Sequence, residues 1–303
     1  MTLAILVAIA GLVLFVVVTD QRIEAVESVD HATIDLEEPA TVGNLTVNVT
    51  VSGGGPIPVV FLHDVDVAGG AVFEGAMAEL PNRFHGVVVD LPGFGLSQRI
   101  TGPDDTYAVA GMADVVAGVL EDRLSISAVI VGVGYGGEVA SEIAVTRPDL
   151  VRGLVLVDVD FWEQPDWLEI AKGLPILGRS ITFTFDAGGL LGTDRWSPNC
   201  DSGGWCPSDA QLSARSIAAS IEGSTDALLG HLETLPSSRV PSALSEIVVP
   251  VSYVWSAKGS VPRETIDRLR AAIAELLLVE SDSWMAHVDD PSAIAGAVDA
   301  VSP

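Results

Sequence analysis

The chain has 303 residues, of which 49% are hydrophobic and 18% are charged. This balance excludes a disordered chain and a coiled coil. The chain has 15 Lys and Arg residues and 41 Asp and Glu residues, and the formal net charge is −26 at pH 7. A nucleic-acid partner needs a basic face, so the composition argues against one. It predicts an acidic protein that repels anionic surfaces.

Residues 1–20 are predicted to form one hydrophobic helix. Residues 3–18 carry no charged or strongly polar side chain, and about 17 to 25 apolar residues cross a bilayer. No Lys or Arg precedes the run, and no small-residue cleavage site follows it, as a signal peptide requires. The segment therefore favours an uncleaved membrane anchor, followed by a polar tether over residues 21–31. Cleavage to a secreted protein is the alternative.

Strands and helices alternate along most of the remaining chain. Residues 32–36 and 45–51 alternate with period two, as half-exposed strands do. Continuous apolar strands are predicted at residues 58–62, 86–90, 128–131, 153–157, 248–254 and 276–279. Helical spacing is found at residues 107–120, 136–145, 263–275 and 291–301. This order predicts an α/β fold with a doubly wound, mostly parallel sheet.

One segment interrupts the alternation and is predicted to be an inserted helical cap over residues 161–246. It contains four of the six tryptophans, namely Trp162, Trp167, Trp196 and Trp205. The core is then made of two parts, residues 32–160 and residues 247–303.

Both cysteines lie in this cap. Cys200 and Cys206 flank a short Gly-rich turn and are candidates for a disulfide. An even number of cysteines and a hydrophobic leader favour an extracytoplasmic location. No second Cys or His pair is near, so neither a metal site nor a cofactor is predicted.

Three motifs follow predicted strands in a fixed order. They are His63-Asp64, Asp90-Leu91-Pro92-Gly93-Phe94-Gly95 and Gly132-Val133-Gly134-Tyr135-Gly136. Their order resembles the α/β-hydrolase superfamily, in particular its cap-bearing esterase, epoxide-hydrolase and dehalogenase-like branch. The resemblance covers roughly residues 40 to 300.

The resemblance also shows where this chain departs from the family's catalytic triad. The nucleophile turn of the family has the sequence pattern G-x-S-x-G, and Gly134 stands at the nucleophile position. Gly259 matches the acid after the late strand Val249 to Trp255, and Trp284 matches the catalytic histidine. Glycine has no side chain that could attack a substrate. The triad is therefore predicted to be lost, and Trp284 is expected to fill part of the old site with an apolar ring.

Residual groups leave an alternative open. His287 could serve as a base, with Asp158 or Asp160 as its acid and an activated water as the nucleophile. The backbone N–H groups of Val65 and Tyr135 match the family's oxyanion donors. Relatives carry glycine where Asp64 stands, and a carboxylate there would oppose developing negative charge.

Two main functions follow from these residues. The first is a non-catalytic homologue, a pseudoenzyme, that binds a small apolar ligand or a protein partner between cap and core. The alternative is an active ester or epoxide type hydrolase that uses His287. A structural envelope protein is a third reading. The pocket is predicted to be lined by His63, Asp64, Val133, Trp162 and Trp284.

Overall fold

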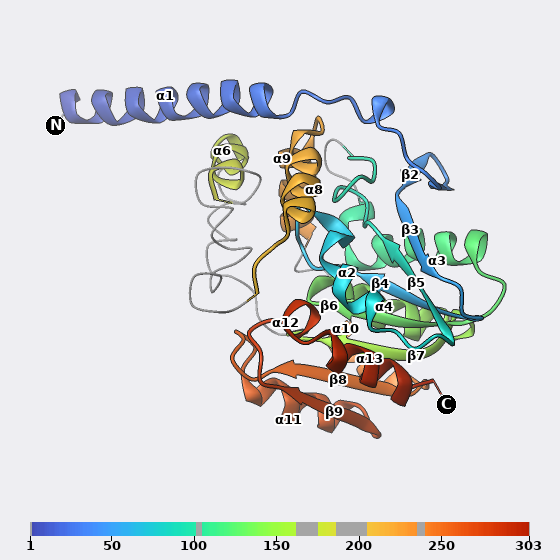
Figure 1. Ribbon diagram of the computed structural model, residues 1–303. Helices are drawn as coiled ribbons and strands as arrows, with labels where there is room; N and C mark the ends of the chain where they lie inside the picture. The colour runs from blue at the N-terminus through green and yellow to red at the C-terminus, as the bar shows by residue number, and fades with distance from the viewer. Residues whose placement is uncertain (1, 101–104, 162–174, 186–204, 235–239, 303) are drawn as a thin grey trace.

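The computed structural model describes residues 2–100, 105–161, 175–185, 205–234 and 240–302. Its centre is a seven-stranded sheet in the order β3-β5-β4-β6-β7-β8-β9 (Figure 1). β3 pairs antiparallel with β5, and the remaining pairs are parallel. The strands are β3 (Val49–Gly53), β4 (Ile57–Leu62), β5 (Phe84–Val89), β6 (Ala128–Val133), β7 (Val151–Val157), β8 (Val251–Ser256) and β9 (Leu276–Ser281). A separate two-stranded sheet pairs β1 (Ala40–Val42) with β2 (Leu45–Val47). The predicted doubly wound α/β fold is confirmed.

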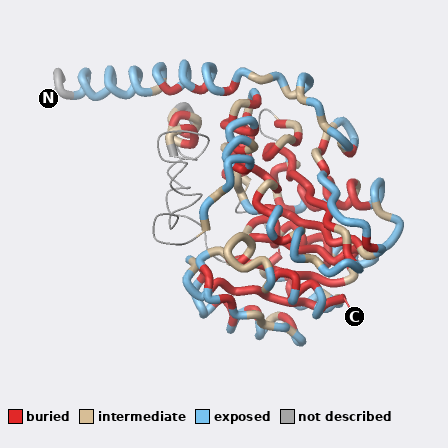
Figure 2. The backbone as a smooth tube through the Cα atoms, viewed as in Figure 1, coloured by how far each residue is buried: buried red, intermediate tan, exposed pale blue. Residues whose placement is uncertain are grey.

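Both faces of the large sheet are covered, which explains why most positions of its central strands are apolar. In β4, Val59 and Phe61 join one hydrophobic cluster, whereas Val60 and Leu62 join the other. Side chains of α3 (Val109–Arg123), α4 (Tyr135–Thr146) and α11 (Arg263–Ala272) belong to the cluster on one face. The cluster on the other face includes α2 (Glu74–Ala78) and α13 (Pro291–Ala300). Figure 2 shows the central strands buried along most of their length.

The strand predicted over residues 32–36 is wrong. A 3-10 turn, η1 (His31–Thr33), begins there, because the Asp30 side chain accepts a hydrogen bond from the Ala32 N–H at 2.9 Å. This local cap outweighs the period-two pattern. The predicted strand 45–51 is divided between β2 and β3.

The named elements of the described part of the insertion are helices. They are α6 (Pro175–Phe185), α8 (Asp209–Ser220), α9 (Ser224–Thr234), α10 (Val240–Ala243) and the 3-10 turn η7 (Leu244–Glu246). Cys206 is disulfide-bonded. Trp162, Trp167, Trp196 and Cys200 lie outside the described residues, so the predicted Cys200–Cys206 pair stays a prediction.

Arg99 joins this insertion to the core. Its side chain is 7% exposed. It donates hydrogen bonds to the carbonyls of Gly95 and Ser97 in the core, and to Ala218 O and Ser224 Oγ in α8 and α9, at 2.5 to 3.1 Å. Burial lowers the pKa of Arg99 to about 10, so the guanidinium is charged at neutral pH. The buried guanidinium of Arg99 thus connects α8 and α9 of the cap with the loop after β5.

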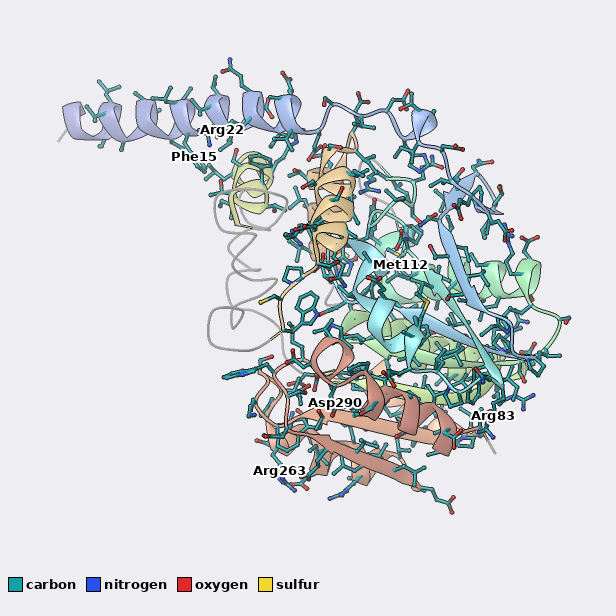
Figure 3. All side chains as sticks on the ribbon, viewed as in Figure 1. Phe15, Arg22, Arg83, Met112, Arg263 and Asp290 are labelled. Carbon is teal, nitrogen blue, oxygen red and sulfur yellow. The ribbon has the colours of Figure 1, made fainter. Side chains whose placement is uncertain are left out.

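The N-terminal helix α1 (Thr2–Val26) continues past residue 20, its predicted end. Ile5 to Val26 is long and apolar enough to cross a membrane. Its N-terminal half projects from the rest of the molecule and is exposed (Figure 2), and its side chains extend away from the helix (Figure 3). By contrast, Thr19 and Ile23 are 6% and 1% exposed. The helix is therefore free at one end and packed at the other.

Candidate functional site

A sharp turn joins β6 to α4 at the carboxyl end of the sheet. Gly134 has φ +49° and ψ −119°, a strained conformation for residues with a Cβ. A Cβ at Gly136 would lie 2.3 Å from the Leu62 carbonyl oxygen, and one at Gly132 would lie 2.5 Å from the Gly136 oxygen. The glycine frame is therefore required by the close approach of strand and helix. In the family that the chain resembles, this turn is the elbow, and the nucleophile stands at the position of residue 134.

The Asp64 carboxylate fills the space above the elbow. A Cβ built on Gly134 would lie 2.3 Å from Asp64 Cγ. Asp64 Oδ1 accepts a hydrogen bond from the Tyr135 N–H at 2.8 Å. Tyr135 N–H is one of the two predicted oxyanion donors, so the Asp64 side chain already occupies it. Asp64 itself is solvent-exposed. The second predicted donor belongs to Val65, which is half-buried on the same loop.

His63 positions this loop. It is fully buried, and its Nε2 accepts the Leu91 N–H at 2.9 Å while Nδ1 lies 2.6 Å from the Asp64 carbonyl oxygen. An N–H can only donate, so Nε2 is unprotonated and Nδ1 carries the proton. Both ring nitrogens are thus used to hold the backbone. Val133, another predicted pocket residue, is buried in the core at the end of β6.

Asp158 lies at the end of β7. This strand is the neighbour of β6 in the sheet, and the elbow follows β6. It adopts φ +49°, which is unusual for a residue with a side chain. Its carboxylate accepts hydrogen bonds from the Ser256 N–H and Ser256 Oγ. Burial raises its pKa above the ordinary value, although these hydrogen bonds oppose the shift. Asp160, two residues on, is half-buried.

Ser256 connects Asp158 to the last loop of the site. The Ser256 hydroxyl accepts the Ala286 N–H at 2.7 Å and contacts Ser283 Oγ at 3.3 Å. This serine was not singled out from the sequence, because its only signal was a polar residue at a strand end. Asp158 therefore holds the loop between β9 and α12 (Ala286–Asp289) in place. Figure 3 labels Asp290, whose Oδ1 accepts the Ala293 N–H and caps α13.

The two other positions that the resemblance assigns to the triad, Gly259 and Trp284, lie close together. A Cβ at Gly259 would lie 2.9 Å from the Trp284 carbonyl oxygen. Trp284 is 47% exposed. The expectation that its ring fills part of the old site stays a prediction. The backbone N–H of Trp284 donates to Asp289 Oδ2 at 3.0 Å.

His287 lies in α12, with its ring 6.3 Å from that of Phe73. Its Nδ1 is buried without a hydrogen-bond partner among the described residues. Burial lowers the pKa of His287 to about 4, and the nearby charge of Asp64 opposes the shift. The imidazole is therefore neutral at pH 7. Within the described parts of the chain, no hydrogen bond joins it to Asp64 or Asp158.

His231 of the cap helix α9 packs against Tyr135, the residue that follows the elbow glycine. It is fully buried, and its ring stands edge-on to Tyr135 at 4.2 Å and to Phe94 at 5.7 Å between centroids. Burial lowers its pKa from an ordinary 6.5 to about 3. This contact could not be predicted from the sequence, because it depends on how the insertion folds back onto the core.

Acid is expected to destabilise the protein through His231. Between pH 6.5 and about 3 the unfolded chain binds a proton that the folded chain excludes. The free energy of unfolding should thus fall by about 1.4 kcal/mol for each pH unit below 6.5. His287 adds a similar loss down to about pH 4. In urea titrations at pH 7, 6 and 5, His231→Leu should lower this slope by about 1.4 kcal/mol per pH unit. An unchanged slope would show that His231 is protonated in the folded protein.

These residues give the site its chemistry. It has two carboxylates, Asp64 and Asp158, and a neutral imidazole, but residue 134 offers no nucleophile. Among the residues that the structure describes, no group of three acidic, His or Cys side chains could hold a metal ion. The arrangement can bind a neutral or cationic group but disfavours an anion.

Comparisons with known proteins agree with this architecture. A model of the alpha/beta hydrolase family matches residues 59–297. A pimeloyl-(acyl-carrier protein) methyl ester esterase of Pectobacterium atrosepticum is 30% identical over 228 residues, which cover 72% of this chain and 82% of the esterase. A 2-(acetamidomethylene)succinate hydrolase of Mesorhizobium japonicum is 35% identical over 117 residues, which cover 39% of this chain and 40% of that hydrolase. The chain thus matches less than half the length of the latter relative.

Solved structures share the fold at low sequence identity. The enol-lactonase of Burkholderia xenovorans superposes with a TM-score of 0.69 at 16% identity, covering 87% of this chain and 99% of the lactonase. A haloalkane dehalogenase of Bradyrhizobium elkani gives 0.68 at 20% identity, covering 87% and 97%. The doubly wound sheet and the elbow between β6 and α4 define an α/β-hydrolase fold. The chain belongs to the alpha/beta hydrolase family, whose model matches most of its length.

Proposed function

We propose that this chain is a membrane-anchored member of the family that binds a small apolar ligand or a protein partner at the elbow without forming a covalent intermediate. The observation that carries the proposal is the position of Asp64. Its carboxylate fills the space that a nucleophile side chain at residue 134 would need. It also accepts the hydrogen bond of the Tyr135 N–H.

Covalent ester hydrolysis meets three obstacles at this site. Gly134 supplies no attacking atom. The tetrahedral oxyanion would need the Tyr135 N–H, which already bonds to a carboxylate at 2.8 Å. The charge on Asp64 would also raise the energy of that oxyanion rather than lower it. Removing one oxyanion donor alone costs about 10²–10³ in kcat in a well-studied protease, so the combined effect is a site with no useful turnover.

The same features favour binding of uncharged molecules. Asp64 is exposed, so a ligand can reach it from solvent. A carboxylate accepts hydrogen bonds but repels anions. The relatives named above include a methyl ester esterase, and an uncharged small ester is therefore the probe of choice.

The test uses the full chain in detergent with p-nitrophenyl butyrate. We expect release of p-nitrophenol at the rate of the protein-free control, together with a rise in Tm as the ester binds. The anion p-nitrobenzoate should leave the Tm unchanged. Turnover that disappears in a folded Gly134→Leu variant would overturn the proposal, and so would the absence of any stabilisation by the ester.

One observation favours the second candidate, an active hydrolase with His287 as its base. The imidazole is neutral at pH 7 and its Nδ1 has no partner among the described residues, so it could accept a proton from water. The same assay with His287→Gln separates the two functions. Turnover in the wild type that is lost in His287→Gln would support the hydrolase and assign the base.

The anchor is part of the proposal. α1 exposes its apolar residues around the whole circumference of its N-terminal half, as a helix surrounded by lipid does. We expect the full chain to remain in the membrane pellet after extraction at alkaline pH. Release into the supernatant would favour a cleaved or peripheral segment.

A further inference from the structure

The C-terminal turns of α1 are fixed to the cap. Thr19 Oγ1 donates a hydrogen bond to Ser180 Oγ of α6 at 2.6 Å. Arg179 of α6 forms ion pairs with Asp20 of α1 and with Asp226 of α9, the latter at 2.8 Å. The anchor therefore meets the cap through side chains of two cap helices rather than through a free linker.

Glu27, one residue past α1, extends this attachment. It is 7% exposed, and its carboxylate accepts hydrogen bonds from Gly223 N–H, Thr225 N–H and Thr225 Oγ at the start of α9. Val29 then pairs with Ile221 in a short parallel bridge. The segment predicted to be a polar tether, residues 21–31, is thus docked through Ile23, Glu27 and Val29.

The contact sets the height of the cap above the bilayer. The apolar run ends at Val18, and the contact begins at the next residue. From Thr19 to Ile23 the helix rises about 6 Å, which is about the depth of the headgroup layer on one side of a bilayer. When residues 3–18 lie in the hydrocarbon, α6 lies at the level of the headgroups.

The candidate site opens toward the same side. α12, which follows the carboxyl end of β9, lies on the side of the sheet toward which α1 projects, while the C-terminus lies on the opposite side (Figure 1). The parallel strands β4, β6, β7, β8 and β9 share this direction. The loops that carry Asp64, Gly134, Asp158 and Trp284 therefore form one surface, the carboxyl-end face.

We infer that the carboxyl-end face rests against the headgroup layer of the bilayer that α1 crosses, and that its partner there is a zwitterionic phospholipid. This inference depends on the anchor in the proposed function. Trp284 supplies the contact, because an exposed indole prefers the boundary between water and lipid. The net charge of −26 and the exposed Asp64 disfavour anionic lipid, whereas the terminal ammonium of phosphatidylcholine complements a carboxylate.

Tryptophan quenching by lipid tests the contact. The full chain is reconstituted in phosphatidylcholine vesicles with and without bromine at shallow acyl positions. The emission of Trp284 is obtained as the wild type minus Trp284→Phe. The matched control is Trp255→Phe, which removes an indole that is only 9% exposed in β8. We expect bromine to quench most of the Trp284 emission and to leave the Trp255 emission unchanged.

The outcomes separate the inference from the anchor. Equal Trp284 emission in both lipids, from protein that resists alkaline extraction, would overturn the inference and leave the anchor intact. Protein that is extracted at alkaline pH would overturn both. In phosphatidylglycerol vesicles we expect weaker quenching of Trp284, and equal quenching there would refute the preference for zwitterionic lipid.

Discussion

Gly134→Ser is expected to lower the stability of the protein without creating an esterase. A serine Cβ would lie 2.3 Å from Asp64 Cγ, at a φ of +49°. Strain of a side-chain-bearing residue in this region costs about 1–3 kcal/mol. Asp64 must also swing away from the Tyr135 N–H, and a hydrogen bond to a charged group contributes about 1.5–3 kcal/mol. We expect a total loss of about 3 kcal/mol, or roughly 5 °C in Tm.

The matched control is Asp64→Gly, alone and combined with Gly134→Ser. Asp64→Gly removes the obstructing carboxylate, and water replaces it at the Tyr135 N–H, so its cost should be about 1 kcal/mol. The double variant should be more stable than the sum of the two single losses predicts, by about 1–2 kcal/mol. Additive losses in thermal unfolding would show that Asp64 does not occupy the nucleophile space.

Arg99→Met should destabilise the protein by about 3 kcal/mol and loosen the cap. The substitution keeps much of the aliphatic volume but leaves the carbonyls of Gly95, Ser97 and Ala218 without their buried donor. Gly95 and Ser97 belong to the core and Ala218 belongs to the cap. The substitution therefore removes a donor that the core and the cap share. Limited proteolysis should cut the insertion faster, and the Tm should fall by about 5 °C.

Arg268→Met is the control for this effect. Arg268 pairs with Glu264 one helical turn away in α11, and its side chain is 48% exposed. Exposed pairs of this kind contribute about 0.3–0.5 kcal/mol. Equal losses in the two variants would contradict the role of Arg99 as a buried connection between cap and core.

The elbow could be predicted from the sequence because its glycines are required locally. Gly132 and Gly136 are spaced as strand-to-helix packing demands, and the strands around them are apolar on both faces. The position of Asp64 above Gly134 could not be predicted, because it depends on the contact between two loops 70 residues apart. The exposure of Trp284 could not be predicted for a similar reason. Its alignment with the catalytic histidine fixes a place in the chain, whereas its direction depends on Asp289 and Ser256.

The docked segment after α1 also affects how strongly the site can bind. A domain on a flexible tether loses rotational freedom whenever it meets a molecule held in the membrane, and that loss weakens binding. Here Glu27 and Arg179 have already removed this freedom during folding. The site therefore faces its surroundings at a fixed angle, and even a weak contact acts at a high effective concentration. With the proposed anchor in a bilayer, such a site would hold a membrane-resident molecule with few hydrogen bonds of its own.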